Sequence, residues 1–215
     1  MINQTYAVFG LGRYGSAVAK ELILSGAEVI AVDNDPNTVE DCATFLPVCK
    51  CADVTDYKVI EQLGIGNVDV VVVAMADSME ASVLAITHCK EAGVKTVIAK
   101  CGNEIHQKIF SSVGADKVVF PEKESGTRLA KNILSAGFMD IIELSKDVSM
   151  VEIDVKPEWI GKDLIELKLR RKYSINIVAI IKKEEVVTTI NPEDPLEADM
   201  KLVVIANKEK LDKIR

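Results

Sequence analysis

Residues 5–35 read TYAVFGLGRYGSAVAKELILSGAEVIAVDND, and this stretch decides the fold. An apolar run over residues 6–9 predicts a strand, which stops at the turn Gly10-Leu11-Gly12-Arg13-Tyr14-Gly15. Apolar side chains then recur at helical spacing, and a β-branched run over residues 29–32 predicts a second strand ending at Asp33. Strand, glycine turn, helix, strand and acid form the context in which G-x-G-x-x-G indicates nucleotide binding. A purely structural glycine turn is the alternative.

Each glycine of the turn has a physical task in that motif. Gly10 permits the tight turn, Gly12 lets the backbone approach a phosphate, and Gly15 lets the helix pack closely on the strand. Phosphate oxygens would meet free N–H groups at the positive end of the helix. Asp33, 18 residues after Gly15, would accept the two ribose hydroxyls, which disfavours a ligand phosphorylated at the 2′ position.

The composition is that of an ordinary globular protein. Of 215 residues, 48% are hydrophobic and 27% charged, and the net charge of −7 argues against a general nucleic-acid binder. No run approaches the roughly 18 apolar residues that a membrane span needs, and the chain enters its first strand without a signal peptide. Five cysteines, an odd number, indicate reduced, intracellular usage. We expect a cytoplasmic protein.

Strands and helices continue to alternate after Asp33. Asp35-Pro36 is typical of a helix N-cap followed by a first-turn proline. Thr55 is expected to cap a helix over residues 56–63. Residues 77–80 are typical of a capping box at the start of the next helix. Six short strands result, and they predict a Rossmann-like, doubly wound parallel sheet in the order 3-2-1-4-5-6. The strands are expected at residues 6–9, 29–32, 47–52, 69–74, 95–100 and 117–120. This domain closes near residue 120, which leaves no room for an inserted catalytic domain.

Two apolar helical segments are expected after the sheet. Pro121 and Glu122 open the first with a proline and a first-turn acid. Residues 135–137 interrupt it, and a second apolar stripe follows at Phe138, Ile141, Ile142 and Leu144. Both segments need a cover, and a partner subunit is the simplest one.

From about residue 149 the pattern changes to short strands around short helices. Strands are expected at 150–155, 176–181, 186–190 and 201–206, with a helix over 164–172 and a terminal helix from Lys208. This predicts a small α+β module.

These residues resemble the RCK (KTN) nucleotide-binding domain, followed by the RCK C-terminal (TrkA-C) module. The first resemblance rests on Gly-Leu-Gly-Arg-Tyr-Gly, Ala-Val-Asp33, Ile98-Ala-Lys100 and Gly114-Ala-Asp-Lys117 with Pro121-Glu-Lys. The second rests on Ile160-Gly-Lys-Asp-Leu through Leu202-Val-Val-Ile. The chain is thus similar to the cytosolic regulatory subunits of Trk/Ktr-type potassium uptake systems. The resemblance implies a nucleotide-binding domain over 1–121, dimerisation and linker helices over 122–147, and the C-terminal module over 148–215.

The resemblance implies a gating ring and not an enzyme. Such subunits pair through the helix after the sixth strand, assemble into an octameric ring, and dock on a membrane potassium-translocating subunit. Exchange of bound ADP for ATP, or of NAD for NADH in some members, changes the shape of the ring and therefore the activity of the channel. The protein would then be peripheral to the membrane through its partner.

The expected cofactor-binding residues surround the glycine turn and the strand ends. Arg13 stands inside the turn, where its guanidinium can reach phosphate oxygens, and Lys100 ends a strand at the same edge. The alternative for both is a solvated surface side chain. The full set is Gly10, Leu11, Gly12, Arg13, Tyr14, Gly15, Asp33, Asn34, Asp53, Val54, Ala74, Met75, Ala76, Lys100 and Glu122.

Two of these residues gain a role from the resemblance alone. Asp53 would contact the adenine, where the alternative is a plain turn residue. Glu122 would lie near the phosphates and help to hold a cation between paired subunits, where the alternative is a favourable first-turn acid. Because a carboxylate beside phosphates needs a bridging ion, that cation would be Mg²⁺, Ca²⁺ or Na⁺.

The tail offers a second ligand site by resemblance, since some Ktr-type subunits bind cyclic di-AMP at the dimer interface of this module. Arg170 or Arg171 would hold phosphate, while Asn176, Ile177 and the neighbourhood of Pro192 would flank the base. The alternative is a solvated basic helix end.

Rival functions stay open. An NAD-dependent oxidoreductase lacks a substrate domain here, and an NAD(H)-responsive redox sensor controlling transcription lacks a basic DNA-binding segment. The ring could also serve another transporter. Cys49-x-Cys51 has the wrong spacing for a zinc knuckle, and His88 and His106 are not expected to be catalytic.

Overall fold

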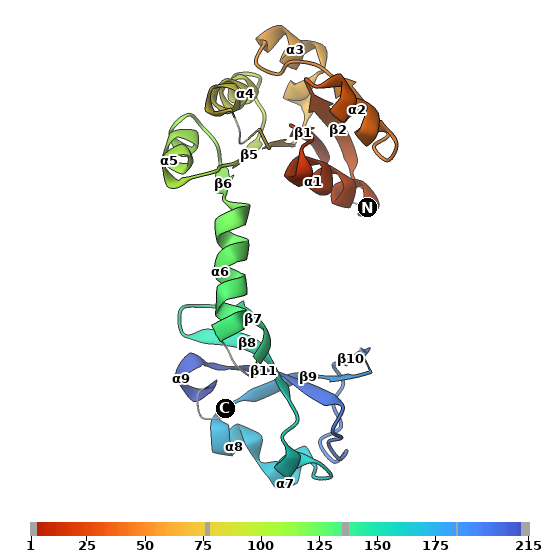
Figure 1. Ribbon diagram of the computed structural model, residues 1–215, viewed down its shortest axis with the longest axis vertical. Coiled ribbons are helices and arrows are strands. Elements are labelled where there is room, and N and C mark those ends of the chain that lie inside the picture. The colour runs from red at the N-terminus through yellow and green to blue at the C-terminus, as the bar shows by residue number, and fades with distance from the viewer. Residues whose placement is uncertain (1–3, 76–77, 135–137, 184, 212–215) are drawn as a thin grey trace. The chain divides into compact units, whose positions relative to one another are not determined.

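The computed structural model describes residues 4–75, 78–134, 138–183 and 185–211 (Figure 1). The chain divides into two compact units, Met1–Lys123 and Glu124–Arg215.

The first unit is built on a six-stranded sheet in the order β3-β2-β1-β4-β5-β6. Every neighbouring pair is parallel. The predicted doubly wound sheet and its strand order are therefore confirmed. The strands are β1 Thr5–Phe9, β2 Glu28–Asp33, β3 Cys49–Cys51, β4 Val70–Val73, β5 Thr96–Lys100 and β6 Lys117–Val119.

Helices cover both faces of this sheet. One apolar core includes Ile60 of α3, Ile86 of α4 and Phe110 of α5, and the opposite core includes Ala19 of α1 and Cys42 of α2. The helices are α1 Arg13–Leu24, α2 Pro36–Ala43, α3 Tyr57–Gln62, the short 3₁₀ helix η1 Ile65–Asn67, α4 Met79–Glu91, α5 Glu104–Ser112 and α6 Pro121–Leu134. Strand β4 consists of four consecutive valines, as is typical of a strand whose two faces are both covered by helices.

Short polar side chains begin the helices at the carboxyl edge of the sheet. Asp35 caps α2 by accepting hydrogen bonds from the N–H groups of Asn37 and Thr38, as predicted. Ser78 caps α4. Asp56, and not Thr55, caps α3. The Thr55 prediction was wrong because the Thr55 hydroxyl and N–H both donate to the Asp53 carboxylate instead.

The second unit contains a five-stranded sheet in the order β10-β9-β11-β8-β7, with every neighbouring pair antiparallel. Its core is formed by Trp159, Leu169, Ile175, Leu202 and their neighbours. The elements after α6 are β7 Phe138–Glu143, β8 Val148–Asp154, η2 Pro157–Trp159, α7 Leu164–Leu167, α8 Leu169–Tyr173, β9 Asn176–Lys182, β10 Glu185–Val187, β11 Met200–Asn207 and α9 Lys208–Leu211.

The predicted second helix after the sheet is wrong, because its apolar stripe forms strand β7. The strand pairs with β8 across a tight turn, in which the N–H of Leu144 donates to the Val148 carbonyl. The register shifts between Met139 and Ile141, so one extra residue separates Phe138 from Ile141. That β-bulge converts a strand spacing of two into three and so imitates a helix. The predicted break at residues 135–137 lies outside the described residues.

The predicted helix over 164–172 is two helices. Lys168 lies between α7 and α8 with φ +50°, in the left-handed region that interrupts a right-handed helix. Leu169, immediately after the break, is buried in the core of the unit.

Candidate nucleotide-binding site

Two glycines of the turn are required by the packing of the chain itself. Gly10 has φ +86°, and a Cβ there would lie 2.8 Å from Met75 Cγ and 3.1 Å from the carbonyl carbon of Ala74. A Cβ on Gly15 would lie 1.8 Å from the carbonyl oxygen of Gly10. Helix α1 therefore sits directly on the turn that follows β1, as the motif requires.

Gly12 differs from its two neighbours. A Cβ at Gly12 would meet no described atom within 4 Å, and the residue has φ −61°, which any amino acid adopts. Gly12 is the first cap position of α1, no side chain of the described residues caps that end, and the first turn holds no acid. The free backbone N–H groups of the first turn of α1 and the positive end of the helix dipole are therefore directed at any ligand that approaches the turn.

Asp33, at the end of β2, connects the glycine turn to the next loop. Its Oδ2 accepts a hydrogen bond from the N–H of Leu11 at 2.6 Å, and its Oδ1 accepts from the N–H of Asp35 at 2.9 Å. These two bonds fix the orientation of the carboxylate. Each carboxylate oxygen can accept a further hydrogen bond, so a ribose diol can still bind.

A pocket at the carboxyl edge of the sheet brings together residues that follow four different strands. It lies where the ends of β1, β2, β3 and β4 meet, which is the usual ligand position in an open α/β sheet. Its lining residues are Gly10, Val32, Asp33, Asn34, Ala52, Asp53, Val54, Thr55, Met75 and Ala81. The structure thus gathers Gly10, Asp33, Asn34, Asp53, Val54 and Met75 of the expected set.

The Asp53 side chain is held by the residue two positions later. Its Oδ1 accepts from the Thr55 N–H at 3.0 Å and from the Thr55 hydroxyl at 2.8 Å. The backbone bond, and then the hydroxyl bond, lower the pKa of Asp53 below its ordinary value. The pocket therefore contains two oriented carboxylates, Asp33 and Asp53, on neighbouring strands.

A charged cluster lies on the other side of the glycine turn. Lys100 Nζ is 2.8 Å from Glu122 Oε1, with Lys100 15% exposed and Glu122 61% exposed. The hydrogen bond from Lys100, with a smaller contribution from the Arg13 charge, holds the pKa of Glu122 below its ordinary value. Lys100 Nζ also lies 5.5 Å from the centre of the Tyr14 ring. Arg13, Tyr14, Lys100 and Glu122 are therefore neighbours around the start of α1.

Three further residues of the expected set are Leu11, Ala74 and Ala76. Leu11 is buried, Ala74 is half-buried beside the turn, and Ala76 lies outside the described residues. The capping role expected of Asp77 falls outside them as well. Thr55 and Ala81 line the pocket and were not expected there, although the Asp53-Val54-Thr55 spacing is typical of a local side-chain turn.

The tail residues occupy the second unit. Arg170 and Arg171 are exposed on α8, Asn176 is exposed at the start of β9, and Ile177 is half-buried. Pro192 accepts a hydrogen bond from the N–H of Leu164 at 3.1 Å. A pocket of about 280 Å³ in this unit is lined by other residues, among them Thr189, Asn191 and Met200.

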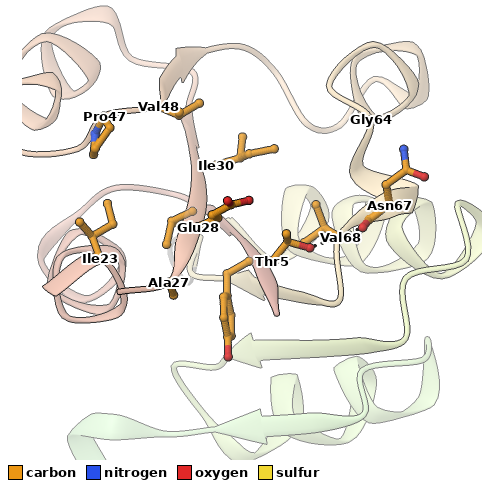
Figure 2. A pocket seen from close by; sticks show the side chains of 12 residues that line it. Thr5, Ile23, Ala27, Glu28, Ile30, Pro47, Val48, Gly64, Asn67 and Val68 are labelled. Atoms are coloured by element: carbon orange, nitrogen blue, oxygen red, sulfur yellow. Dashed lines mark hydrogen bonds between the residues drawn. The ribbon is translucent and has the colours of Figure 1, made fainter. Parts of the chain in front are cut away.

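A larger pocket, of about 440 Å³, lies at the opposite edge of the first sheet. Figure 2 shows Ile23 and Ala27 on one side and Asn67 and Val68 on the other. Thr5 and Glu28, which begin β1 and β2, belong to its lining. Its walls are mostly apolar and it is remote from the helix start, so it does not provide the N–H groups that bind phosphate.

The cysteines and the candidate metal positions add no further chemistry. Burial raises the pKa of the Cys89 thiol to about 12. Burial is also the largest cause of the raised pKa of the Cys49 thiol. In the part of the chain that the structure describes, no three His, Cys, Asp or Glu side chains gather as a metal site.

Comparison with known proteins identifies the family. Residues 6–121 match the TrkA-N domain and residues 148–215 match the TrkA-C domain. The chain belongs to the TrkA-N/TrkA-C family of RCK-domain proteins. The family resemblance inferred from the sequence is thereby confirmed.

Several relatives of this RCK-domain protein are potassium uptake proteins. The chain is 37% identical to the Ktr system potassium uptake protein C of Bacillus subtilis, over 96% of this chain and 93% of the relative. It is 30% identical to the Ktr system potassium uptake protein A of Vibrio alginolyticus, over 97% and 95%. Its fold is similar to part of a solved structure described as the GsuK channel bound to NAD, with TM-score 0.64 and 17% identity, covering 97% of this chain and 38% of that one. None of the described helices is both long and apolar enough to span a membrane.

Proposed function

We propose that this protein is the nucleotide-sensing regulatory subunit of a Ktr/Trk-type potassium uptake system. The family and its potassium uptake relatives support the class of function. A regulatory subunit needs a ligand site coupled to an element that leaves the domain, and one observation carries that coupling. Lys100, beside the start of α1, is paired with Glu122 in the first turn of α6.

The ligand that fits this site is an adenine nucleotide. Phosphates would bind at the start of α1 with Arg13 and Lys100, the ribose at Asp33, and the base toward Asp53. The three positions follow β1, β2 and β3, which are adjacent in the sheet. ATP and ADP are the favoured pair. NAD and NADH are the alternative, because all four share the adenosine ribose and a solved relative of this fold is a channel bound to NAD.

Competition for Lys100 provides the switch. A phosphate chain that reaches Lys100 would draw its ammonium away from Glu122, because a phosphate group carries more negative charge than one carboxylate. The freed Glu122 carboxylate would then lie beside phosphate oxygens, and a bridging Mg²⁺, Ca²⁺ or Na⁺ ion would relieve the repulsion. ATP and ADP differ in how far they extend, so they would favour different positions of the first turn of α6.

Assembly is the second part of the proposal. Leu129 and Ile133 of α6 are 60% and 72% exposed, and Ile142 and Leu144 are 52% and 53% exposed. These side chains support pairing of two copies through residues 122–147, between a nucleotide domain over 1–121 and the C-terminal module over 148–215. Four such pairs would form an octameric ring that docks on a membrane potassium-translocating subunit from the cytoplasm. No catalytic step is proposed.

The C-terminal module would bind cyclic di-AMP between two copies. Arg170 or Arg171 would meet its phosphates, while Asn176, Ile177 and the Pro192 loop would flank the base. The exposed guanidinium groups on α8 support this assignment.

A ligand titration tests the nucleotide part. The melting temperature of the purified protein is measured with ATP, ADP, NAD, NADH and cyclic di-AMP, with Asp33→Ala alongside. Stabilisation of the wild type by ATP and ADP, absent in Asp33→Ala, is expected by mass action. Stabilisation by NAD or NADH alone would make the protein a redox-linked sensor.

A transport assay tests the regulatory part. The protein is co-expressed with the potassium-translocating subunit from the same genome in a bacterium deficient in potassium uptake. We expect uptake to depend on this protein and to fall in Asp33→Ala. Uptake that is equal with and without the protein would refute the regulatory function.

A further inference from the structure

His88 connects helix α4 to the loop that lines the nucleotide pocket. Its Nε2 lies 3.0 Å from the carbonyl oxygen of Thr55, which is 33 residues earlier in the chain. The side chain is 17% exposed, and the Tyr57 ring packs edge-on against it with centres 5.4 Å apart. A histidine so placed is held in one orientation.

The Thr55 contact defines which ring nitrogen carries a hydrogen. A carbonyl oxygen only accepts, so Nε2 must be the donor. Nδ1 is buried without a hydrogen-bond partner among the described residues, and the Glu91 carboxylate lies 3.6 Å from it. The function of the ring within the described chain is therefore to donate from Nε2 to Thr55.

Thr55 in turn orients Asp53. The Thr55 N–H and hydroxyl both donate to Asp53 Oδ1, and all of residues 53–55 line the pocket. The internal bonds shape this loop, the buried Val54 packs it into the core, and the His88 contact adds a hydrogen bond to α4. A movement of Thr55 would carry the Asp53 carboxylate with it.

Helix α4 also contacts a second residue that lines the pocket. The Ser82 side chain is buried, and its hydroxyl oxygen lies 2.9 Å from the carbonyl oxygens of both Met75, another lining residue, and Ser78, so its one hydrogen is shared between them. Helix α4 therefore contacts two lining residues, Thr55 after β3 and Met75 after β4. Contacts from one helix to both lining residues would keep the distance between them constant, as a selective binding site requires.

We propose that His88 is a positioning residue that sets base selectivity in the nucleotide site. It fixes the loop so that Asp53 Oδ2, which the Thr55 bonds leave unused, can accept a hydrogen bond from the 6-amino group of adenine. A base with an oxygen at position 6 would place two acceptors against each other and bind more weakly. This inference rests on the proposed nucleotide function and adds its base specificity.

Three variants separate positioning from general stability. His88→Gln keeps an N–H donor at the place of Nε2, whereas His88→Leu removes it and leaves the Thr55 carbonyl unpaired. His106→Leu is the matched control, because His106 is the other histidine of the chain and packs against Phe110 on α5, away from the pocket lining.

Dissociation constants for ATP and for inosine triphosphate, which has an oxygen at position 6, give the readout. We expect the wild type to prefer ATP about tenfold, the preference to fall near one in His88→Leu, and His88→Gln and His106→Leu to retain it. Equal preference in wild type and His88→Leu would overturn the inference, as would a wild type that binds both nucleotides equally. A wild type that binds neither, and that binds neither NAD nor NADH, would instead remove the proposed nucleotide function, and this inference with it.

A spectroscopic measurement tests the contact without any variant. Long-range nitrogen–proton correlation spectra resolve the tautomers of the two imidazole rings. We expect His88 to show the Nε2–H form with that proton protected from solvent exchange. A His88 ring carrying its hydrogen on Nδ1 alone would exclude the bond to Thr55 and overturn the inference.

Discussion

Lys100 Nζ lies 2.8 Å from Glu122 Oε1, and this pair joins the end of β5 to the first turn of α6. The Lys100 side chain is mostly buried, while the Glu122 side chain is mostly exposed. Lys100 therefore cannot lose its partner without gaining another anion or becoming more solvated. A bound phosphate would supply that anion, which makes this pair the natural point of exchange between ligand and helix.

Opposite effects on nucleotide binding are expected from the two members of the pair. Lys100→Met removes a phosphate partner and should weaken ATP binding by about tenfold, the value of one charge-assisted hydrogen bond. Glu122→Gln removes the competitor and should tighten ATP binding when no divalent cation is present. Titration calorimetry with and without Mg²⁺ measures both.

The response to Mg²⁺ distinguishes the two roles of Glu122. If Glu122 holds a bridging cation, Mg²⁺ should tighten ATP binding to the wild type and have less effect on Glu122→Gln. Lys123→Met is a suitable control, because Lys123 is paired with Glu104 and not with Glu122. An identical Mg²⁺ response in wild type and Glu122→Gln would show that Glu122 does not hold a cation.

The glycines of the turn are expected to separate stability from binding. Gly15→Ala places a methyl group against the Gly10 carbonyl and should lower the free energy of unfolding by about 3 kcal/mol. Gly12→Ala has room for its methyl group and a compatible backbone, so its stability should stay close to that of the wild type. The same methyl group would stand where a phosphate approaches the helix start, so nucleotide binding should be lost.

Denaturant unfolding and a nucleotide titration on both variants measure these two effects. Gly26→Ala provides a control for backbone strain without a clash, since Gly26 has φ +83° and open space around it. Full nucleotide affinity in Gly12→Ala would contradict the assignment of the phosphate position.

The stability of the first unit should decline in acid partly through Asp116. The hydrogen bond from the Val97 N–H, at 2.7 Å, lowers the pKa of Asp116 most, and Lys90 adds to the effect. Because the folded-state pKa is below the ordinary value of 3.8, the carboxylate stabilises the fold above that value. This contribution is lost as the pH falls from 3.8 through the folded-state pKa.

Asp116→Asn tests this pH dependence. The side chain is 42% exposed, so solvent screening limits the expected loss at neutral pH to about 1 kcal/mol. The difference from wild type should shrink as the pH falls from 3.8 through the folded-state pKa, because the Asp116 carboxylate becomes protonated there. Glu158→Gln, an exposed position in the other unit, controls for the change in net charge. A difference that is constant with pH would contradict the role of the Asp116 charge.

The sheet order could be predicted because local signals determine it. Buried apolar runs, such as the four valines of β4, can be recognised from neighbouring residues alone. The same is true of glycine turns and short connections. The irregular elements could not be predicted, since the bulge in β7 disguises its period and Lys168 adopts a left-handed conformation that lysine rarely takes. Residues such as Lys100 and Glu122 were found separately, but their pairing depends on the tertiary fold. The His88–Thr55 contact joins residues 33 positions apart and leaves no mark in either local pattern.

The exposed apolar side chains of α6 should hold two copies together. Leu129 and Ile133 lie one helical turn apart, and each exposes more than half of its surface. Replacing both with glutamate would place two charges in an apolar contact, so the dimer and any ring built from it should dissociate. Because both residues lie beyond the unit that contains the nucleotide pocket, the double variant should keep its affinity for ATP.

Analytical ultracentrifugation at several protein concentrations measures the assembly state of this double variant. Ile165→Glu is the matched control, because Ile165 is an apolar residue of α7 that is 54% exposed and lies outside residues 122–147. We expect the control to sediment like the wild type and the Leu129→Glu/Ile133→Glu protein to sediment as a monomer. A double variant that still forms the wild-type assembly would place the subunit contact elsewhere on the chain, and α6 would then serve only to connect the two units.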